Sequence, residues 1–385
     1  EAVELETDVL ILGAGPVGLT LHLALAARGI RSHLIERRPM SALQADPRVL
    51  ALSHGARQLL EQIDSWPARA ATAIENIHIS QRGGFGRTVL DKAEYGLPAL
   101  GYVVRYREVV AALARHLSAG ALFAEAEGVA TQVTPQGVQL TLRQGEVSQT
   151  LRGSLLVHAE GTPGDDPEVS VRDYGQQAVI CEVTPEQPHA QRAWERFTPD
   201  GPLALLPLGD EFSVVFTLPP AKAAAVLAQD DAAFICALEA QFGRRLRFSR
   251  PSRRNSFPLA LRMRRTLARG NEVWVGNAAQ TLHPVSGQGF NLGLRDAWEL
   301  AEKLLDGLEQ DPDSGHPAAL AAYARGRQLD RRGSMAFTDG IVRLFSNDIP
   351  PLKLARSLGL LALDLAPPLR HFVAKRMIWG ARAWP

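Results

Sequence analysis

The residues of this sequence whose types and spacing could do chemistry gather in two glycine-rich segments. The first runs from Gly13 to Gly18 and follows a short apolar stretch, Thr7 to Leu12, that is typical of a buried strand. Between a strand and a helix, Gly13 permits a tight turn, Gly15 lets the backbone approach a pyrophosphate, and Gly18 allows the helix to pack on the sheet. The helix then points free N–H groups at the phosphates. The segment therefore predicts a dinucleotide site.

An acid completes this first site. A second strand-like run ends at Glu36, 23 residues after Gly13, where a carboxylate can accept hydrogen bonds from both ribose hydroxyls. This favours an unphosphorylated ribose, as in FAD or NAD, over that of NADP, and the motif alone fits FAD and NAD equally. The alternative is a glycine turn that precedes a helix by chance. The residues predicted to contact the nucleotide here are Gly13, Gly15, Pro16, Val17, Gly18, Glu36 and Arg37.

The second segment begins 260 residues after Gly13 and extends from Val273 to Asn291. It repeats the order of strand, glycine-rich loop and helix start. An NAD-dependent dehydrogenase has no need for such a second loop, whereas the ribityl chain and ring of FAD lie far from its adenine end. The backbone N–H groups that open the helix at Gly287 to Asn291 can stabilise negative charge on a reduced flavin. The two segments together therefore favour FAD.

Several stretches carry a resemblance to a known family. The glycine run at Gly13, DPRVLALS at residues 46–53 and the block from Gly276 to Asp296 resemble the single-component aromatic hydroxylases of the para-hydroxybenzoate hydroxylase superfamily. QRGGFGRT at residues 81–88 and GNAAQTLHPVSGQGFNLGLRDA from Gly276 are similar to its ubiquinone-biosynthesis branch, closest to the 2-polyprenyl-6-methoxyphenol hydroxylases. The resemblance covers nearly the whole chain. It implies an α/β fold: a Rossmann-like FAD-binding domain of the glutathione-reductase type with an inserted β-sheet substrate domain and C-terminal helices.

The resemblance also implies cofactor contacts. Asn277 stands where most of the superfamily has an aspartate that binds the ribityl chain, and this branch often has asparagine. Arg48 matches an arginine that reaches the cofactor, although it could instead pair with Asp46 or Glu36. The usual Asp-Gly pair is replaced by Glu160-Gly161, so no role is assigned to Glu160. Further contacts are expected from Arg107 (or Arg105), Val129 (or Ala130), Gly287, Gln288, Gly289, Phe290 and Asn291.

For the chemistry, the resemblance implies hydroxylation of an activated phenol. Reduced flavin and O₂ would give a flavin C4a-hydroperoxide that delivers oxygen to the ring, with NADH or NADPH as the transient reductant. The protein must supply a dry pocket and dipoles around the flavin. Pro284 and His283 are the expected catalytic positions. The Pro284 carbonyl would orient or polarise the ring hydroxyl, and His283 would either handle a proton or form a structural hydrogen bond.

The elements that must position these residues follow from the periodicity of apolar residues. Strand, helix and strand open the chain, and a helix is predicted from Arg107 to Leu117. Strand-like pieces dominate between Tyr174 and Arg265, and long helices are predicted at Gln288–Leu308 and Ala318–Phe345. We therefore expect a discontinuous FAD-binding domain (1–173 and 266–345), a substrate domain (174–265) and a C-terminal helical region (346–385).

Composition limits the other classes of function. The 385 residues are 46% hydrophobic and 22% charged, and the formal net charge of +1 gives no electrostatic reason to expect a nucleic-acid partner. Cys181 and Cys236 fit neither a disulfide framework nor a metal site, so no metal is expected. We find no secretion signal and no 18-residue uncharged apolar run, and expect a cytoplasmic protein.

The stretch from Pro350 combines Leu and Ala runs with basic residues and the single acid Asp364. This combination is typical of an interfacial helix, and a polyprenyl-phenol substrate resides in a bilayer. Contact with the inner face of the membrane, or with a ubiquinone-biosynthesis complex, is one interpretation; a helix packed on the flavin domain is the other. The basic residues are Lys353, Arg356, Arg370, Lys375, Arg376 and Arg382.

Other functions remain compatible with the two glycine-rich segments. One is a flavoprotein of the same fold that does not insert oxygen, such as a prenyl reductase. Another is a non-catalytic FAD-binding scaffold of a biosynthetic complex. An NAD-dependent dehydrogenase is disfavoured by the second segment and predicts a colourless protein.

Overall fold

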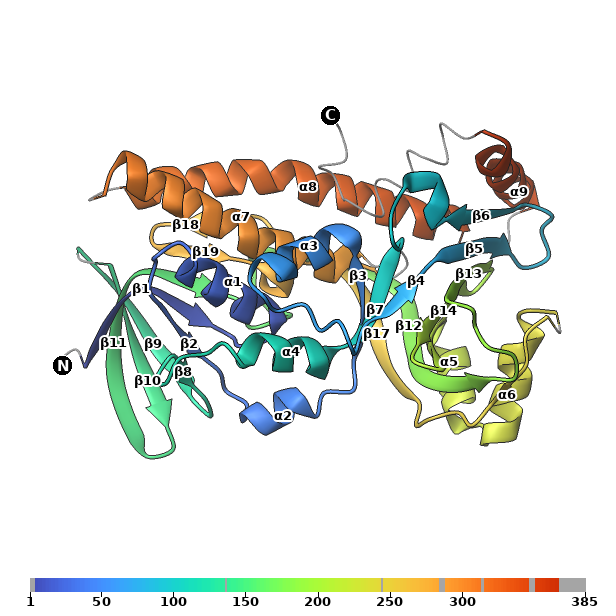
Figure 1. Ribbon diagram of the computed structural model, residues 1–385, viewed down its shortest axis with the longest axis horizontal. Helices are drawn as coiled ribbons and strands as arrows, with labels where there is room; N and C mark the ends of the chain where they lie inside the picture. Colours follow the sequence, from blue (N-terminus) through green and yellow to red (C-terminus); the bar gives the residue numbers. More distant parts are fainter. Residues whose placement is uncertain are drawn as a thin grey trace.

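The computed structural model describes residues 4–135, 137–243, 245–283, 288–312, 315–345 and 350–366. Pro284 and Gly287, both named above as site residues, lie outside the described residues, as does the chain beyond residue 366. Figure 1 shows a sheet at each end of an elongated molecule, with the long helix α8 (Gly315–Phe345) running along one side from one sheet to the other.

Strand β1 (Leu5–Leu12) is central in the first sheet, where it pairs in parallel with β2 and β11. Its side chains alternate between two cores, as strand geometry requires. Val9 and Ile11 pack with the helices, whereas Leu10 and Leu12 pack under the antiparallel extension of the sheet. The sheet order is β18 (Ala268–Arg269), β19 (Glu272–Trp274), β11 (Val147–His158), β1, β2 (Ser32–Ile35) and β8 (Leu122–Phe123), with β10 (Gly137–Gln144) on β11 and β9 (Glu127–Thr134) on β10.

Helices cover the Val9 face of this sheet. α1 (Pro16–Ala26) is apolar on almost every side because it lies between β1 and α7 (Gln288–Gln310), and α8 packs on α7. The helix expected at Arg107 to Leu117 is α4 (Tyr106–Ala114). No helix among the described residues is long and apolar enough to cross a membrane. The other helices are α2 (Met40–Gln44), α3 (His54–Gln62), α5 (Pro220–Ala228), α6 (Asp231–Ala240) and α9 (Pro350–Leu365), with 3-10 turns η1 (Lys92–Tyr95) and η2 (Gly276–Ala278).

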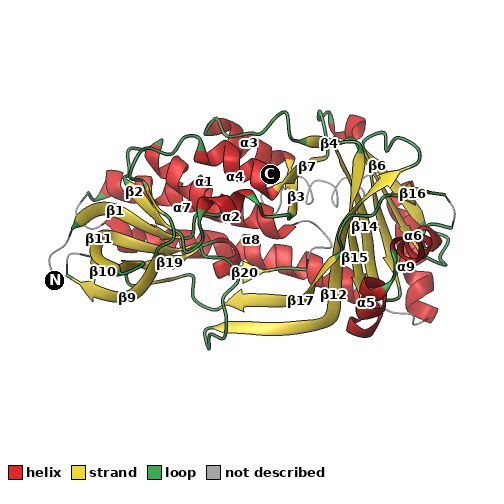
Figure 2. Ribbon diagram, turned by 90° about the horizontal axis from the view of Figure 1, so that it is seen from below, coloured by secondary structure: helices red, strands yellow, loops and turns green. Residues whose placement is uncertain are grey.

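The second sheet stands at the other end of the molecule (Figure 2). One of its faces buries apolar side chains against α5 and α6. Residues 76–91 pair into this sheet although they precede the expected substrate domain in sequence, and the domain boundaries themselves stay a prediction. The order is β20 (Gln280–Thr281), β17 (Asn255–Arg264), β12 (Val169–Pro185), β15 (Glu211–Leu218), β14 (Gly201–Leu208), β13 (Arg192–Thr198), β5 (Asn76–Gln81) and β6 (Arg87–Asp91), with β16 (Phe248–Ser249) on β12.

Two smaller features tie these parts together. A short sheet of β3 (Val49–Ser53), β7 (Gly101–Arg105) and β4 (Thr72–Ile74) lies between the large sheets. The glycines of QRGGFGRT lie in the β5–β6 hairpin against α9. A Cβ on Gly84 would come within 2.6 Å of Ser357 Oγ, and one on Gly86 within 2.2 Å of the Ser357 carbonyl oxygen. Glycine is therefore needed there for close helix packing.

Candidate functional site

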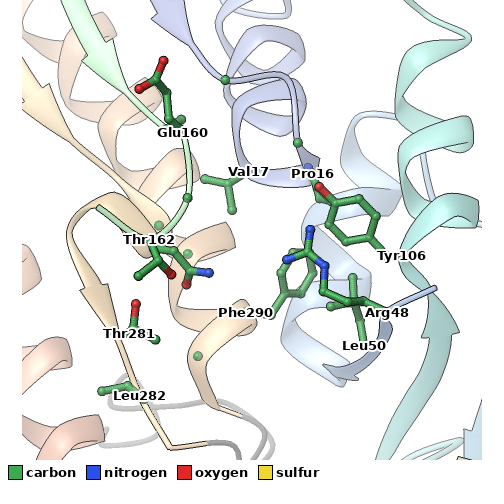
Figure 3. Close-up of a pocket in the computed structure, with 18 of the residues that line it drawn as sticks. Pro16, Val17, Arg48, Leu50, Tyr106, Glu160, Thr162, Thr281, Leu282 and Phe290 are labelled. Atoms are coloured by element: carbon green, nitrogen blue, oxygen red, sulfur yellow. The ribbon is translucent and has the colours of Figure 1, made fainter. Parts of the chain in front are cut away.

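A cavity of about 620 Å³ lies where the two large sheets face each other. Its lining comes from the loops after β1 and β11, from β3 and α4, and from η2 and the start of α7. Leu206, Val215 and Phe257 of the second sheet form its apolar wall. Figure 3 shows Arg48, Tyr106 and Phe290 on one side of the cavity and Thr162, Thr281 and Leu282 on the other.

The first glycine segment forms one end of this cavity. Gly13 has a φ of +105°, and a Cβ there would lie 2.3 Å from the Ala159 carbonyl oxygen. A Cβ on Gly18 would lie 2.0 Å from the Gly13 carbonyl oxygen, so the turn and the helix are in direct contact. No side chain caps the N-terminus of α1, and Pro16 occupies its first turn. The free N–H groups and the helix dipole can therefore act on an anion in the cavity.

Glu36 lies beside this turn with 6% of its surface exposed. It accepts hydrogen bonds from the Ala14 N–H at 2.9 Å and from the Arg38 N–H and Nε at 3.0 Å. Burial alone would raise the pKa of Glu36, but the hydrogen bonds from Arg38 and Ala14 outweigh it and hold that pKa below its usual value. The side chain is therefore a fixed carboxylate at the cavity, with lone pairs left for a ligand.

The second glycine segment meets the first at Val17. Gly276, with a φ of +63°, lies so close that a Cβ would be 3.2 Å from Val17 Cγ1, and a Cβ on Gly293 would be 3.0 Å from Val17 Cγ2. Asn277 projects into the cavity next to this contact with an exposed side chain. Two segments separated by 260 residues thus build one continuous wall.

A buried ionic network holds the second segment in place. Asp296 of α7 accepts hydrogen bonds from the Gly276 N–H at 2.9 Å and from Gln280 Nε2 at 2.7 Å. Arg327 of α8 donates to Asp296 at 2.6 Å and to Glu299 at 2.8 Å. Sequence reasoning missed Arg327, and no local signal marks it, because other arginines such as Arg325 and Arg331 stand close by in the same helix.

Asn291 and its neighbours begin α7. The Asn291 side chain accepts from the Ser53 N–H at 2.9 Å and donates to the Ala51 carbonyl at 3.0 Å, so it ties α7 to β3. Gly289 and Phe290 line the cavity. The Gln288 backbone starts the helix, but its side chain is outside the described part of the chain.

Arg48 lies at the cavity and is also paired with Asp46. It lines the cavity and its guanidinium lies 4.2 Å from the Tyr106 ring centroid. It also forms hydrogen bonds with both carboxylate oxygens of Asp46, at 2.8 to 3.1 Å. Tyr106, which sequence reasoning missed, approaches the phosphate turn as well, because a Cβ on Gly15 would be 3.0 Å from its hydroxyl oxygen.

His283 is fully buried at the edge of the second sheet. Its Nε2 lies 3.0 Å from Gln176 Oε1, and its ring packs edge-on against Tyr174 at 5.1 Å. Burial lowers the pKa of His283 to about 4. The ring is therefore neutral near pH 7, which favours the structural interpretation over proton handling.

The remaining predicted residues separate into two groups. Arg37 lines the cavity beside Glu36. Arg107 and Val129 are exposed and are not among the cavity-lining residues; Val129 lies on β9 with 45% of its surface accessible. Gly161 adopts a φ of +88°, and Glu160, Gly161 and Thr162 all line the cavity. Among the described residues no group of three or more His, Cys, Asp or Glu side chains could hold a metal ion.

The residues present fit an extended dinucleotide such as FAD. The glycine turn leaves backbone space at the α1 N-terminus, Glu36 is an ionised acceptor beside it, and the cavity continues past Asn277 to an apolar wall. An adenosine ribose, a pyrophosphate and a flat apolar ring each find matching chemistry along the cavity.

Comparison with known proteins gives a consistent result. Residues 6–335 match the protein-family model described as FAD binding domain. The chain is 35% identical to ubiquinone hydroxylase UbiL of Rhodospirillum rubrum, covering 98% of this chain and 91% of that protein. It is 30% identical to 3-demethoxyubiquinol 3-hydroxylase of Escherichia coli, covering 96% and 97%. These matches confirm the resemblance noted in the sequence.

A solved structure confirms the predicted fold class. The crystal structure of p-nitrophenol 4-monooxygenase PnpA from Pseudomonas putida superposes with a TM-score of 0.78, covering 98% of this chain and 99% of that one. The sequence identity is 16%, so this likeness concerns the fold alone.

Proposed function

This chain belongs to the FAD binding domain family, and we propose that it hydroxylates a phenolic precursor of ubiquinone, using FAD, NAD(P)H and O₂. Relatives named ubiquinone hydroxylase and 3-demethoxyubiquinol 3-hydroxylase align with almost its whole length. A prenyl reductase or a non-catalytic scaffold of the same fold is therefore not favoured.

One observation carries the proposal: a single cavity joins the phosphate turn to an apolar wall. Gly13, Gly15 and Glu36 line one end, and Leu206, Val215 and Phe257 line the other. A nucleotide bound at the first end leaves the apolar end for a second, water-avoiding molecule. That arrangement suits a reaction between a flavin and an aromatic ring from which water must be kept away.

The residues that would hold FAD follow from the geometry. The α1 N-terminus would bind the pyrophosphate, Glu36 would accept hydrogen bonds from the ribose hydroxyls, and Asn277 would contact the ribityl chain. Arg48 and Tyr106, held as a stacked pair, would close the cavity beside β3. Asn291 acts indirectly by fixing β3 to α7.

When bound and reduced by NAD(P)H, FAD supplies the electrons with which one atom of O₂ enters the phenol ring. The chain's own part is to exclude water and to orient the ring. Leu206, Val215 and Phe257 supply the apolar surface for this. Pro284, which adjoins His283, remains the proposed contact to the ring hydroxyl, and His283 would position that segment through its hydrogen bond with Gln176.

The substrate proposed in more detail is a phenol with a polyprenyl tail, which implies contact with a membrane surface. The exposed face of α9 supports this. Leu354, Leu358, Leu361 and Leu365 follow one another at spacings of four, three and four residues, so they share one face, and between 37% and 72% of each is accessible. Phe85, 61% exposed, lies in the hairpin loop against which α9 packs.

The visible absorption spectrum of the purified protein tests the function first. We expect flavin bands that bleach under anaerobic NADH or NADPH, and bleach faster when a short-chain 2-prenylphenol is present. With ¹⁸O₂ the phenol product should carry one ¹⁸O atom. A colourless protein that FAD cannot restore would contradict the flavin site; reduction without labelled product would instead indicate a reductase.

A further inference from the structure

Arginines gather on the face of the second sheet that packs on α6, where the outer strands β6, β5 and β13 lie side by side. Arg87 of β6 pairs with Ser80 of β5, and Ser80 pairs with Arg196 of β13, so these residues form one row across the sheet. Arg192 lies four residues before Arg196 in β13 and therefore shares its face. Arg196 Nη1 donates to Ser80 Oγ at 2.9 Å, which fixes the middle of the row.

The segment that follows α6 adds to this row. Phe242 packs edge-on against Trp194 of β13, with 6.3 Å between the ring centroids. The Arg245 N–H donates to the Phe242 carbonyl at 3.2 Å, which places Arg245 beside that contact. Arg82, just beyond β5, donates to Gln241 Oε1 at 3.2 Å and so joins the β5–β6 hairpin to the end of α6. We call the following residues the arginine cluster: Arg82, Arg87, Arg192, Arg196 and Arg245.

The arginine cluster has no carboxylate to balance it. None of its members forms an ion pair within the part of the chain that the structure describes, and Asp91 of β6 accepts from the Ala93 N–H instead. Arg196 is 8% exposed, and its Nε has no hydrogen-bond partner. Burial, together with the charges of four cluster members, lowers the pKa of His78 to about 4, so this ring is neutral. The end of α6 contributes only about half a negative charge through its dipole.

The tip of the hairpin adds an exposed aromatic side chain. Phe85 lies between Arg82 and Arg87 in a run of glycines, and 61% of its surface is accessible. α9, with its exposed leucines, packs on the other side of the same hairpin. Figure 1 shows the hairpin, α6 and α9 together at one end of the molecule. Apolar side chains beside several arginines are the combination that binds a membrane surface with anionic headgroups.

We propose that the arginine cluster binds the phosphate headgroups of anionic phospholipids, with Phe85 inserted between the lipids. This rests on the proposed function, because the proposed polyprenyl phenol resides in a bilayer. Guanidinium groups match phosphate oxygens with paired hydrogen bonds, and a negative membrane surface attracts exposed arginines. The cluster thus makes the contact selective for charge, whereas the α9 leucines contribute apolar burial to any bilayer.

The test measures co-sedimentation of the FAD-loaded protein with vesicles of phosphatidylcholine alone, or of phosphatidylcholine and phosphatidylglycerol in equal parts. The exposed members of the cluster are removed together in the triple variant Arg82→Gln, Arg87→Gln and Arg245→Gln. Because each arginine near an anionic surface raises affinity roughly fivefold, this variant should bind the mixed vesicles roughly 100-fold more weakly. Its binding to phosphatidylcholine should equal that of the wild type, whereas Phe85→Ser should weaken binding to both.

The matched control removes the same amount of charge from exposed positions around the first sheet, at the other end of the molecule. It carries Arg31→Gln, Arg143→Gln and Arg269→Gln and should bind mixed vesicles as the wild type does. A second variant replaces the three exposed cluster arginines with lysine. It keeps the charge and should bind mixed vesicles within about threefold of the wild type, which separates loss of charge from any loss of folding.

Two outcomes would overturn the assignment. One is equal binding of the wild type to the two kinds of vesicle, which would leave an acidic protein as the partner of the arginine cluster. The other is unchanged binding of the triple glutamine variant to mixed vesicles. Vesicle binding needs neither a reductant nor turnover, so a lack of labelled product would count against the hydroxylase function alone.

Discussion

At the scale of single residues, we predict that nucleotide binding depends most directly on Glu36. Replacing it with Gln keeps the shape but removes the charge that strengthens hydrogen bonds from ribose hydroxyls. We expect Glu36→Gln to weaken FAD affinity by about 10-fold to 100-fold, the range for one or two charge-assisted hydrogen bonds. Titration of the apoprotein with FAD, followed by flavin fluorescence, measures this. Glu61→Gln on the exposed side of α3 is the control, and equal affinities in the two variants would contradict the assignment.

His283 gives a prediction about pH. Burial lowers the pKa of His283 to about 4, whereas an unfolded histidine has a pKa near 6.5. Between these values the unfolded chain binds more protons than the folded one, so this residue removes stability as the pH falls through that window. We expect His283→Gln to narrow the difference in melting temperature between about pH 7.5, which lies above this window, and about pH 5, which lies inside it. His116→Gln, at an exposed position, should leave the difference as it is in the wild-type protein.

These residues also mark what sequence alone can predict about the site. Gly13, Gly15 and Glu36 were identifiable because backbone space and charge at a strand–helix junction have few substitutes. Tyr106 was not, because its approach to Gly15 depends on how α4 packs against the glycine turn, which the local sequence does not encode. The same reasoning explains Asn291: a polar residue at a helix start predicts a ligand contact, while only the fold reveals that β3 is its partner.

At the scale of elements, α7 and α8 support the second glycine segment through Arg327. Its guanidinium contacts Asp296, Glu299 and Asp330 within 2.8 Å and is 1% exposed. Although burial opposes ionisation, Arg295 and Arg327 hold the pKa of Asp330 well below its usual value. Arg327 and Asp330 are therefore both charged, and removing Arg327 would leave buried negative charge uncompensated.

Replacing Arg327 with Met should consequently lower the free energy of unfolding by about 3–5 kcal/mol, the range for a broken buried ion pair. Because Asp296 also accepts from the Gly276 N–H, FAD should dissociate at a lower denaturant concentration than in wild type. Urea titration with far-ultraviolet circular dichroism and flavin fluorescence follows both. Arg325→Met on the exposed face of the same helix should cost little. A similar loss of unfolding free energy in both variants would mean that substitutions anywhere on helix α8 destabilise the protein, whether or not they touch the ion cluster.

Elements differ in how well their sequences predict them. α7 and α8 carry long helical patterns, and β1 is a continuous apolar run, so their positions follow from the local sequence. The placement of β5 and β6 in the second sheet does not follow from the local sequence, because β5 pairs in parallel with β13, more than 100 residues away. Strand pairing at that distance is decided by the whole fold, which periodicity does not encode.

At the scale of the molecule, the exposed leucines of α9 lie at the same end as the second sheet and its hairpin (Figure 1). The buried face of α9 packs on β6, so the helix already has its place in the fold. Its leucine face is therefore not needed for folding. The polyprenyl substrate that we propose would have to leave a bilayer to reach the cavity, and an apolar helix face on the surface of the protein would bring the enzyme to that bilayer.

Replacing Leu358 and Leu361 with Glu should reduce binding to phospholipid vesicles at least about 10-fold, since each change removes roughly 1.5–3 kcal/mol of apolar burial and adds a charge. Co-sedimentation with phosphatidylcholine vesicles that contain phosphatidylglycerol measures this. Leu329→Glu is the matched control, because Leu329 is 76% exposed on α8 and away from the α9 face. Activity on a short-chain phenol in solution should be unchanged in all variants, while activity on a long-chain phenol in vesicles should fall only with the α9 substitutions. Equal vesicle binding by the α9 variant and wild type would exclude this face as the contact with the membrane.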